Sequence, residues 1–207
     1  MSFEKLTESI YRLCVPFENI YTAVFALRSG NAWALLDGAT TKEDAENYIL
    51  PALKELGAKP EYIFCSHLHD DHAGGIFRIS EEFTDAPVVH FGKPMKEWKS
   101  TRTAKDGEIF FERFTVLNLS GHADECLAVL DIKDKILLSV DALQPGRVGR
   151  FLPSVSNQAS YAKTLRRVKN LDLLTVITSH DYDPFGCRAD GQTEIEKYLL
   201  ECEKILK

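Results

Sequence analysis

The sequence predicts a layered α/β fold with mixed β-sheets, and three observations support this prediction. The chain has 207 residues, enough for one domain of ordinary size. Its composition is that of a globular protein, with 44% hydrophobic and 27% charged residues. Short apolar runs that are typical of strands come in groups, and segments with helical periodicity separate these groups. We therefore expect a single domain over residues 1–207.

Three strands are expected near the N-terminus because the runs at 10–15, 20–27 and 33–36 are rich in β-forming residues. The polar stretch Ser29-Gly30-Asn31 between the last two runs predicts a hairpin turn. A tight turn at 133–135 predicts a second hairpin. Further short apolar runs predict strands at 62–65, 86–89, 114–119, 127–132, 136–140 and 173–178.

Three helices are expected from periodicity and from their end signals. The first begins near Thr40, which forms a capping box with Glu43; Pro51 should kink it and Gly57 should end it. The second runs from about residue 158 to residue 171. The third is the C-terminal helix, where a second capping box is expected at 193–196. Its apolar stripe comprises Ile195, Tyr198, Leu199, Cys202, Ile205 and Leu206.

Charge, hydropathy and cysteine content exclude several classes of partner. There are 25 basic and 31 acidic residues, a net charge of −6, so no nucleic-acid partner is expected. No apolar run approaches the roughly 18 residues that span a bilayer, and the N-terminus does not match a signal peptide. The five cysteines are irregularly spaced, which indicates reduced thiols rather than disulfides. We therefore expect a cytoplasmic protein without a membrane partner.

The segment 67–72, His-Leu-His-Asp-Asp-His, concentrates residue types that bind metals. It directly follows a predicted strand. His67 and His69 are two residues apart and can point to the same ion, whereas Asp71 and His72 come around the next turn and can face a second ion. Imidazole nitrogens and carboxylate oxygens together suit zinc, iron or manganese. The alternative is an accidental polar turn, which would lack companions further along the chain.

Three such companions are present, each at the end of a predicted strand. They are His122, Asp141 and His180. Taken singly, a histidine after a strand is more often a hydrogen-bonded surface residue, and an aspartate in this position is more often a helix or turn cap. Three coincidences of this kind fit one shared cleft better than three unrelated surface positions.

With these residues in this order, the sequence resembles the metallo-β-lactamase superfamily. The matching features are H-x-H-x-D-H at 67–72, the later Gly-His, Asp and His, and Asp37-Gly38 upstream. The resemblance implies an αββα sandwich of two mixed β-sheets flanked by helices. It also implies two divalent metal ions, zinc in the first place, with iron or manganese as alternatives. The implied ligands are His67, His69 and His122 for the first ion, Asp71, His72 and His180 for the second, and Asp141 as a bridge.

In detail, the sequence is most similar to the glyoxalase II group and its persulfide dioxygenase relatives. Both carry Gly-Arg after the bridging aspartate and a tyrosine two residues after the last histidine, which implies Arg150 and Tyr182 as substrate-binding residues. Tyr182 as a half-buried aromatic and Arg150 as a solvated loop residue are the alternatives. Glu125 departs from the family pattern. The segment after His180 has the length of one helix, so a glutathione-binding helical domain is not expected.

Three functions follow, with a small-molecule substrate as the expected partner of the first two. The leading hypothesis is a binuclear metal-dependent hydrolase of an ester, thioester or lactone, in which a metal-bridging hydroxide attacks the carbonyl. Asp71 would be its catalytic residue, orienting the nucleophile and passing a proton to the leaving group. The second is a mononuclear iron persulfide dioxygenase-like oxidoreductase that uses His67, His122 and Asp141. The third is a non-catalytic, metal-loaded binding module. The sequence does not predict the oligomeric state.

Overall fold

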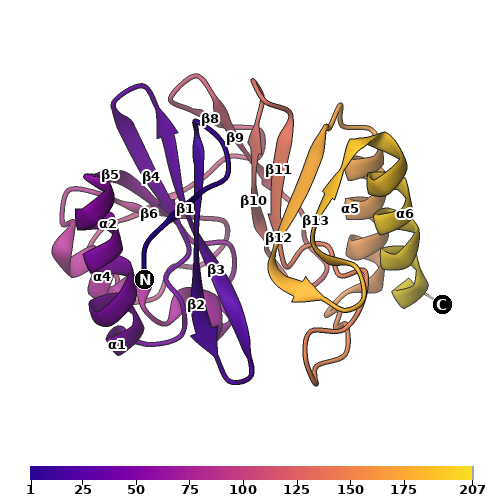
Figure 1. The fold of residues 1–207 in the computed structure, drawn as a ribbon, viewed down its shortest axis with the longest axis horizontal. Helices are drawn as coiled ribbons and strands as arrows, with labels where there is room; N and C mark the ends of the chain where they lie inside the picture. The colour runs from indigo at the N-terminus through magenta and orange to yellow at the C-terminus, as the bar shows by residue number, and fades with distance from the viewer. Residues whose placement is uncertain (207) are drawn as a thin grey trace. The chain divides into compact units, whose positions relative to one another are not determined.

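The structure is a computed structural model that describes residues 1–206. The chain divides into two compact units, Met1–Ala104 and Lys105–Lys207. Each unit contains one mixed β-sheet with its own helices (Figure 1). Among the described residues, no helix combines the length and the apolar character that crossing a bilayer would require.

The first unit is built on a seven-stranded sheet whose strands lie in chain order. They are β1 (Glu4–Lys5), β2 (Ile10–Phe17), β3 (Ile20–Ser29), β4 (Ala32–Leu36), β5 (Pro60–Phe64), β6 (Val88–His90) and β7 (Thr101–Thr103). Neighbours from β1 to β4 are antiparallel, and neighbours from β4 to β7 are parallel. The carboxyl ends of β4, β5 and β6 therefore share one edge, where ligands commonly bind in open α/β sheets.

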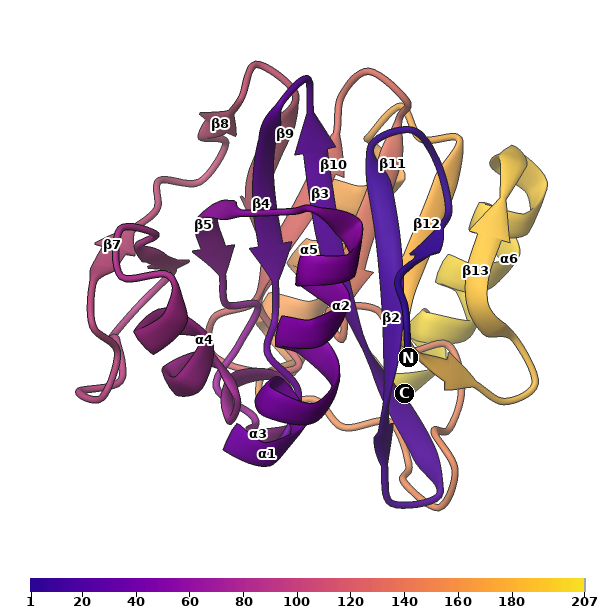
Figure 2. The same ribbon diagram turned by 60° about the vertical axis from the view of Figure 1, so that its left-hand side comes forward.

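Short helices follow β4 and β5 in this unit. After β4 come α1 (Lys42–Asp44), the π-helical turn η1 (Ala45–Ile49) and α2 (Leu50–Leu56); after β5 come α3 (Asp70–Ala73) and α4 (Ile76–Glu82). In Figure 1, α1, α2 and α4 lie over one face of the sheet. The core between them contains the buried side chains of Val24, Leu35, Ile49, Leu53, Ile63 and Ile76. In Figure 2, β4 and β5 both point toward the end of the unit where α1 and α3 lie.

The predicted start of the first helix is wrong by one residue. The N-cap is Thr41, whose side chain accepts from the Asp44 backbone N–H at 3.0 Å while the Thr41 N–H donates to the Asp44 carboxylate at 2.9 Å. Two adjacent threonines each have an acidic residue three positions on, so the pattern fits both registers. Pro51 lies in the first turn of α2, where its missing N–H is tolerated. Gly57 ends the helix in a left-handed conformation as predicted.

The second unit contains a six-stranded sheet and two long helices. The strands are β8 (Ile109–Phe110), β9 (Phe114–Asn118), β10 (Leu127–Asp131), β11 (Ile136–Val140), β12 (Thr175–Tyr182) and β13 (Gly186–Asp190), in the spatial order β13-β12-β11-β10-β9-β8. Among the described residues of this unit, only β11 and β12 pair in parallel. Helices α5 (Gln158–Lys169) and α6 (Gly191–Glu203) cover one face of the sheet (Figure 1). Their apolar stripes, which include Tyr161, Leu165, Tyr198 and Leu199, pack into one core.

Two expectations for this unit are corrected. The strand expected at 173–178 is β12, which runs on to Tyr182 and pairs with β13, a strand the sequence did not indicate. The capping box expected at 193–196 does not form, because the N-cap of α6 is Asp190, three residues before the predicted N-cap Thr193. The Glu194 carboxylate accepts from the Asp190 backbone N–H at 3.0 Å, which supplies part of a capping box without the predicted threonine.

Candidate metal centre

The segment 67–72 leaves the carboxyl end of β5, a strand inside the parallel part of the first sheet. Residues 65–69 form a loop and α3 begins at Asp70, so the two histidines expected to extend a strand lie beyond its end. His67 and His72 are buried, Asp71 is half-buried and His69 is exposed. The side chains thus lie at the sheet edge where parallel strands end.

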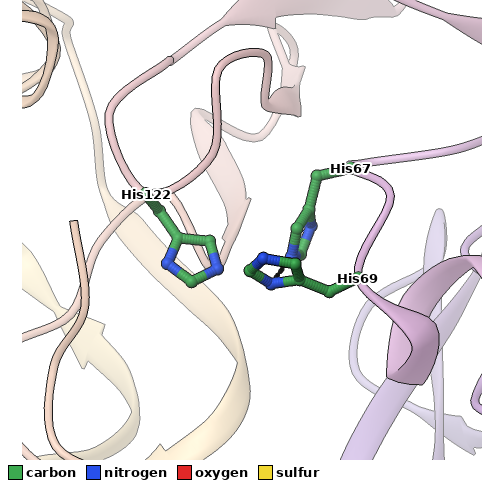
Figure 3. Close-up of side chains that lie close together, drawn as sticks. All are labelled: His67, His69 and His122. Carbon is green, nitrogen blue, oxygen red and sulfur yellow. Dashed lines mark hydrogen bonds between the residues drawn. The ribbon is translucent and has the colours of Figure 1, made fainter. Parts of the chain in front are cut away.

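His67 and His69 lie side by side. The Nε2 atom of His67 is 2.9 Å from the Nδ1 atom of His69, and the ring centroids are 4.5 Å apart (Figure 3). Two imidazole nitrogens that face one another this closely can bind the same cation. The two histidines were expected to point the same way because of strand-like spacing, and they lie together although they belong to a loop.

His72 is oriented by Asp37, which follows β4. Its Nδ1 atom lies 2.7 Å from Asp37 Oδ2, and both side chains are fully buried. Ser66 donates to the same carboxylate twice, from its backbone N–H at 2.7 Å and from its hydroxyl at 2.8 Å. When Nδ1–H donates to a carboxylate, Nε2 keeps its lone pair, and this is how proteins commonly prepare a metal-binding histidine. The sequence identified Asp37 only as part of a family motif, and it did not indicate Ser66.

The carboxylate of Asp71 accepts a hydrogen bond from a residue of strand β3. The hydroxyl of Thr22, which is buried, donates to Asp71 Oδ2 at 3.1 Å, and His72 Nε2 lies 3.3 Å from the same oxygen. Thr22 is 49 residues away in the chain, so no local pattern could reveal this contact. The carboxylate of Asp71 and the Nε2 atom of His72 are adjacent, as two ligands of one ion would be.

In the second unit, Asp141 lies between two histidines. Its Oδ2 atom is 3.6 Å from His122 Nε2, and its Oδ1 atom is 3.5 Å from His180 Nε2. His122 (labelled in Figure 3) follows β9 and Asp141 follows β11. His180 lies within β12 rather than after a strand, because β12 is longer than expected. All three side chains are buried.

The backbone that carries Asp141 is strained. Val140 has φ = 50°, a conformation that β-branched residues rarely adopt, and the pairing of β11 with β12 is irregular between residues 138 and 140. The Ser179 hydroxyl donates to Asp141 Oδ1. Strain of this kind costs on the order of 1–3 kcal/mol and clusters at functional sites. The strained turn is thus a further indication that the position of Asp141 matters.

Tyr182 and Arg150 have contrasting surroundings. Tyr182 is only 1% exposed, and burial raises the pKa of its hydroxyl well above the ordinary value, so the phenol is neutral at physiological pH. Its ring lies 6.2 Å from that of His180. Arg150 is exposed, with its guanidinium 5.2 Å from the ring centre of Phe151. Their roles as substrate-binding residues stay predictions.

The candidate donors of each unit suit divalent metal ions. Three imidazoles and one carboxylate lie in the first unit, and two imidazoles and one carboxylate lie in the second, the residue types that zinc, iron and manganese accept. Within the first unit, His67 and His72 offer ligand atoms within 4.8 Å of one another, and so do Asp71 and His72. Within the second unit, Asp141 approaches both histidines. The chemistry and spacing inside each unit therefore fit metal ligation.

A family model of the metallo-beta-lactamase superfamily matches residues 19–180. This match covers most of the chain and includes every candidate ligand. The chain belongs to the metallo-β-lactamase superfamily. Membership implies a hydrolase-like protein that binds divalent metal, in agreement with the histidine and aspartate clusters. It confirms the family that the sequence motifs indicated.

Individual relatives are similar to this chain in sequence or in fold. Hydroxyacylglutathione hydrolase of Citrobacter koseri is 27% identical over 138 residues, which cover 65% of this chain and 53% of the relative. The chain thus spans about half the length of this curated relative. The DIM-1 metallo-β-lactamase superposes with a TM-score of 0.74 at 14% identity, covering 98% of this chain and 97% of that one.

The sec-alkylsulfatase Pisa1 of Pseudomonas sp. superposes with a TM-score of 0.72 at 12% identity, covering 99% of this chain and 41% of the sulfatase. These structural likenesses show the fold. The prediction of two mixed β-sheets flanked by helices, the metallo-β-lactamase fold, is confirmed. Since one fold serves a lactamase and a sulfatase, the reaction must be argued from the site.

Proposed function

We propose that this chain is a metal-dependent hydrolase of a small ester, thioester or lactone with a binuclear site. In this proposal zinc is the first choice of metal, and iron or manganese are alternatives. The proposed ligands are His67, His69 and His122 for one ion, Asp71, His72 and His180 for the other, and Asp141 for both. The observation that carries the proposal is the placement of Asp141, with one carboxylate oxygen toward each of two histidines.

This placement favours a bridging carboxylate. A carboxylate that serves one ion needs one oxygen, or both oxygens on the same side. Here the two oxygens face Nε2 atoms of different residues, His122 at 3.6 Å and His180 at 3.5 Å. Ser179 donates to the oxygen that faces His180 and so helps to fix the carboxylate plane. Two separate histidines on two oxygens support two ions rather than one.

When bound, the two metal ions would supply a water of lowered pKa, near 7, and a Lewis acid for the substrate carbonyl. The chain's own residues would orient the water, transfer its proton and bind the substrate. Asp71, held by the Thr22 hydroxyl, would orient the attacking water and carry its proton to the leaving group. The exposed Arg150 guanidinium would attract a substrate carboxylate. Tyr182, a neutral phenol, would donate a hydrogen bond rather than accept a proton.

The proposed substrate class is a small acyl compound. The relative named hydroxyacylglutathione hydrolase supports a thioester among the candidates. The chain spans about half of that relative. We propose a small molecule as the only partner class and a cytoplasmic location. The net charge of −6 supports the absence of a nucleic-acid partner, and efficient cleavage of RNA by the pure protein would contradict it.

Metal content combined with a substrate panel tests the proposal. The full chain, purified without added metal and then loaded with zinc, should hold about two zinc ions per chain and cleave esters, thioesters or lactones. Asp141→Asn should lose at least one ion and most of the activity. Asp131→Asn is the matched control, because Asp131 is also buried in the second unit but binds Arg113 instead of a histidine.

Two outcomes would redirect the proposal. One iron per chain with oxygen consumption on a persulfide would favour the dioxygenase. Two zinc ions without turnover on any carbonyl, sulfate or phosphodiester substrate would favour the metal-loaded binding module. Full metal content in Asp141→Asn would refute the bridging role.

A further inference from the structure

Gln144 is a buried amide beside the ligands of the second unit. It lies three residues after Asp141, at the start of the segment that joins β11 to α5, and it is 4% exposed. A buried carboxamide is costly unless both its oxygen and its nitrogen find partners. The partners of Gln144 therefore indicate what the residue does.

The side chain of Gln144 bridges three groups. Its Oε1 atom accepts from the Ser154 backbone N–H at 2.7 Å, and its Nε2 atom donates to the Asp141 backbone carbonyl at 3.3 Å. These two backbone contacts fix the orientation of the amide, because an N–H can only donate and a carbonyl can only accept. The remaining amide hydrogen is then available to His122, whose Nδ1 atom lies 2.6 Å from Nε2.

The Nδ1 atom of His122 has an acceptor beside it as well. The Ser154 carbonyl lies 3.0 Å away. The ring is therefore held by Gln144 when Nδ1 carries no proton, and by Ser154 when it does. Only the second arrangement leaves the lone pair on Nε2 for a cation. Gln144 contributes to both, because its contact with the Ser154 N–H holds the residue that supplies the carbonyl.

Packing fixes the backbone around Gln144. Its N–H donates to the Tyr161 hydroxyl at 3.1 Å, and Tyr161 is fully buried on α5. The same tyrosine packs on the residue before His122: a Cβ on Gly121 would lie 2.5 Å from the Tyr161 Cα atom. Gln144 and the residue before His122 are thus both held against the same helix, α5. This arrangement suits a residue that sets the position of another side chain.

We propose that Gln144 is the positioning residue of His122: it fixes Ser154, whose carbonyl accepts from His122 Nδ1–H in the arrangement that leaves Nε2 for a cation, and it fastens the segment 143–157 to the ligands. The inference rests on the proposed metal-binding function and adds a role for a residue outside the ligand set. It makes metal affinity depend on an uncharged side chain that contacts no cation. Disturbing the acceptor that orients a ligating histidine typically lowers metal affinity by about 10–100-fold, and Gln144 holds that acceptor through the Ser154 N–H.

The test is the zinc affinity of Gln144→Met, measured on the metal-free full chain by competition with a chromophoric chelator. Methionine has a similar volume but no hydrogen-bonding amide. We expect about 10–100-fold weaker binding of one zinc ion. Thr175→Val is the matched control: Thr175 is buried in the same unit and its hydroxyl donates to Asp190 at 2.8 Å, away from the ligands. The control should lower the Tm without weakening zinc binding.

A second readout needs no metal. In the metal-free protein, the ring ¹⁵N shifts of His122 should change in Gln144→Met and stay unchanged in Thr175→Val, because Gln144 contacts the ring whereas Thr175 donates to Asp190. If Gln144→Met does not fold, Gln144→Asn provides the test, since its side chain is too short to span the same three groups. It should weaken zinc binding in the same direction.

Unchanged affinity in the Gln144 variants, or an equal loss in Thr175→Val, would overturn the inference. His122→Ala separates this failure from a failure of the proposed function. If His122→Ala keeps both zinc ions, the ligand assignment is wrong. If His122→Ala loses zinc and Gln144→Met does not, only the positioning role is wrong.

Discussion

At the residue scale, Asp37 is a buried carboxylate of the first unit that is held by several donors. It accepts hydrogen bonds from the Ser66 backbone N–H, the Ser66 hydroxyl and His72 Nδ1, all between 2.7 and 2.8 Å. It is fully buried and adopts φ = 69°, a conformation that aspartate and asparagine tolerate better than most residues. A buried carboxylate held by three donors is rigid, so it can fix the histidine ring that it contacts.

Asp37→Asn should therefore weaken metal binding while preserving the backbone. Asparagine keeps the shape and tolerates the positive φ, but its amide nitrogen cannot accept from His72 or Ser66. We expect zinc affinity to fall by about 10–100-fold, measured by chelator competition. Asp131→Asn, another buried aspartate, should leave zinc affinity unchanged. An affinity for Asp37→Asn equal to that of the unmodified chain would mean that His72 needs no orienting partner.

At the element scale, the junction of α3 and α4 presses against the loop that follows β4. A Cβ on Gly75 would lie 2.0 Å from the Gly38 carbonyl oxygen, and one on Gly74 would lie 1.8 Å from the Thr40 carbonyl oxygen. The Gly75 N–H donates to the Ala39 carbonyl at 3.1 Å. The glycines thus let the helix that carries His72 approach the loop that carries Asp37. The glycine pair after the histidine motif is a packing requirement.

Gly75→Ala should destabilise the first unit through collision alone. Gly75 has an ordinary backbone conformation, φ = −84°, so the added methyl brings no strain in φ. Overpacking against backbone should cost about 3 kcal/mol, measured by urea unfolding. Gly57→Ala is the comparison: its φ is 68° but a Cβ there meets nothing within 4 Å, so about 1 kcal/mol is expected. Equal losses would show that the collision at Gly75 is relieved by a shift of the loop.

At the scale of the whole molecule, each unit buries a thiol deep in its core. Cys65 is 2% exposed in the first unit and Cys202 is fully buried in the second. Burial raises the pKa of the Cys65 thiol well above its ordinary value, and it raises that of Cys202 from 9.0 to about 12. Cys14 and Cys187 are partly exposed. The five cysteines thus report on the integrity of both units.

Thiol titration at pH 8 should therefore show two classes of cysteine. Cys14 and Cys187 should react quickly with an aromatic disulfide reagent, whereas Cys65, Cys126 and Cys202 should react only after unfolding. Fast reaction of four or five thiols in the native protein would contradict the buried placement.

The raised pKa of Cys202 also sets a pH dependence of stability. The folded protein holds the proton more tightly than the unfolded chain, so this contribution is complete below about pH 9 and is lost as the pH rises toward 12. Urea midpoints should therefore fall above pH 9, and the fall should be smaller in Cys202→Ala. A pH dependence identical to that of the unmodified chain would show that Cys202 does not contribute.

The sequence by itself determined the fold class, the family and the residues of the candidate ligand set. These features are readable locally, because metal ligands are restricted to a few residue types and strands and helices impose their own periods. The boundaries of some elements could not be predicted, because local patterns fitted more than one answer or gave none. Two adjacent threonines fitted the first capping box. The strand β13 has little apolar character, so its sequence did not predict a strand.

Only the tertiary structure decided which side chains orient the candidate ligands. Asp37 contacts His72 across 35 residues of sequence, and Gln144 contacts His122 across 22. The sequence around a carboxylate or an amide does not show whether the side chain orients a ligand, because this role depends on burial and on the path of the backbone between strands. Strain is hidden in the same way: Val140 is an ordinary strand residue in the sequence, and only its φ of 50° shows that the chain turns sharply to present Asp141.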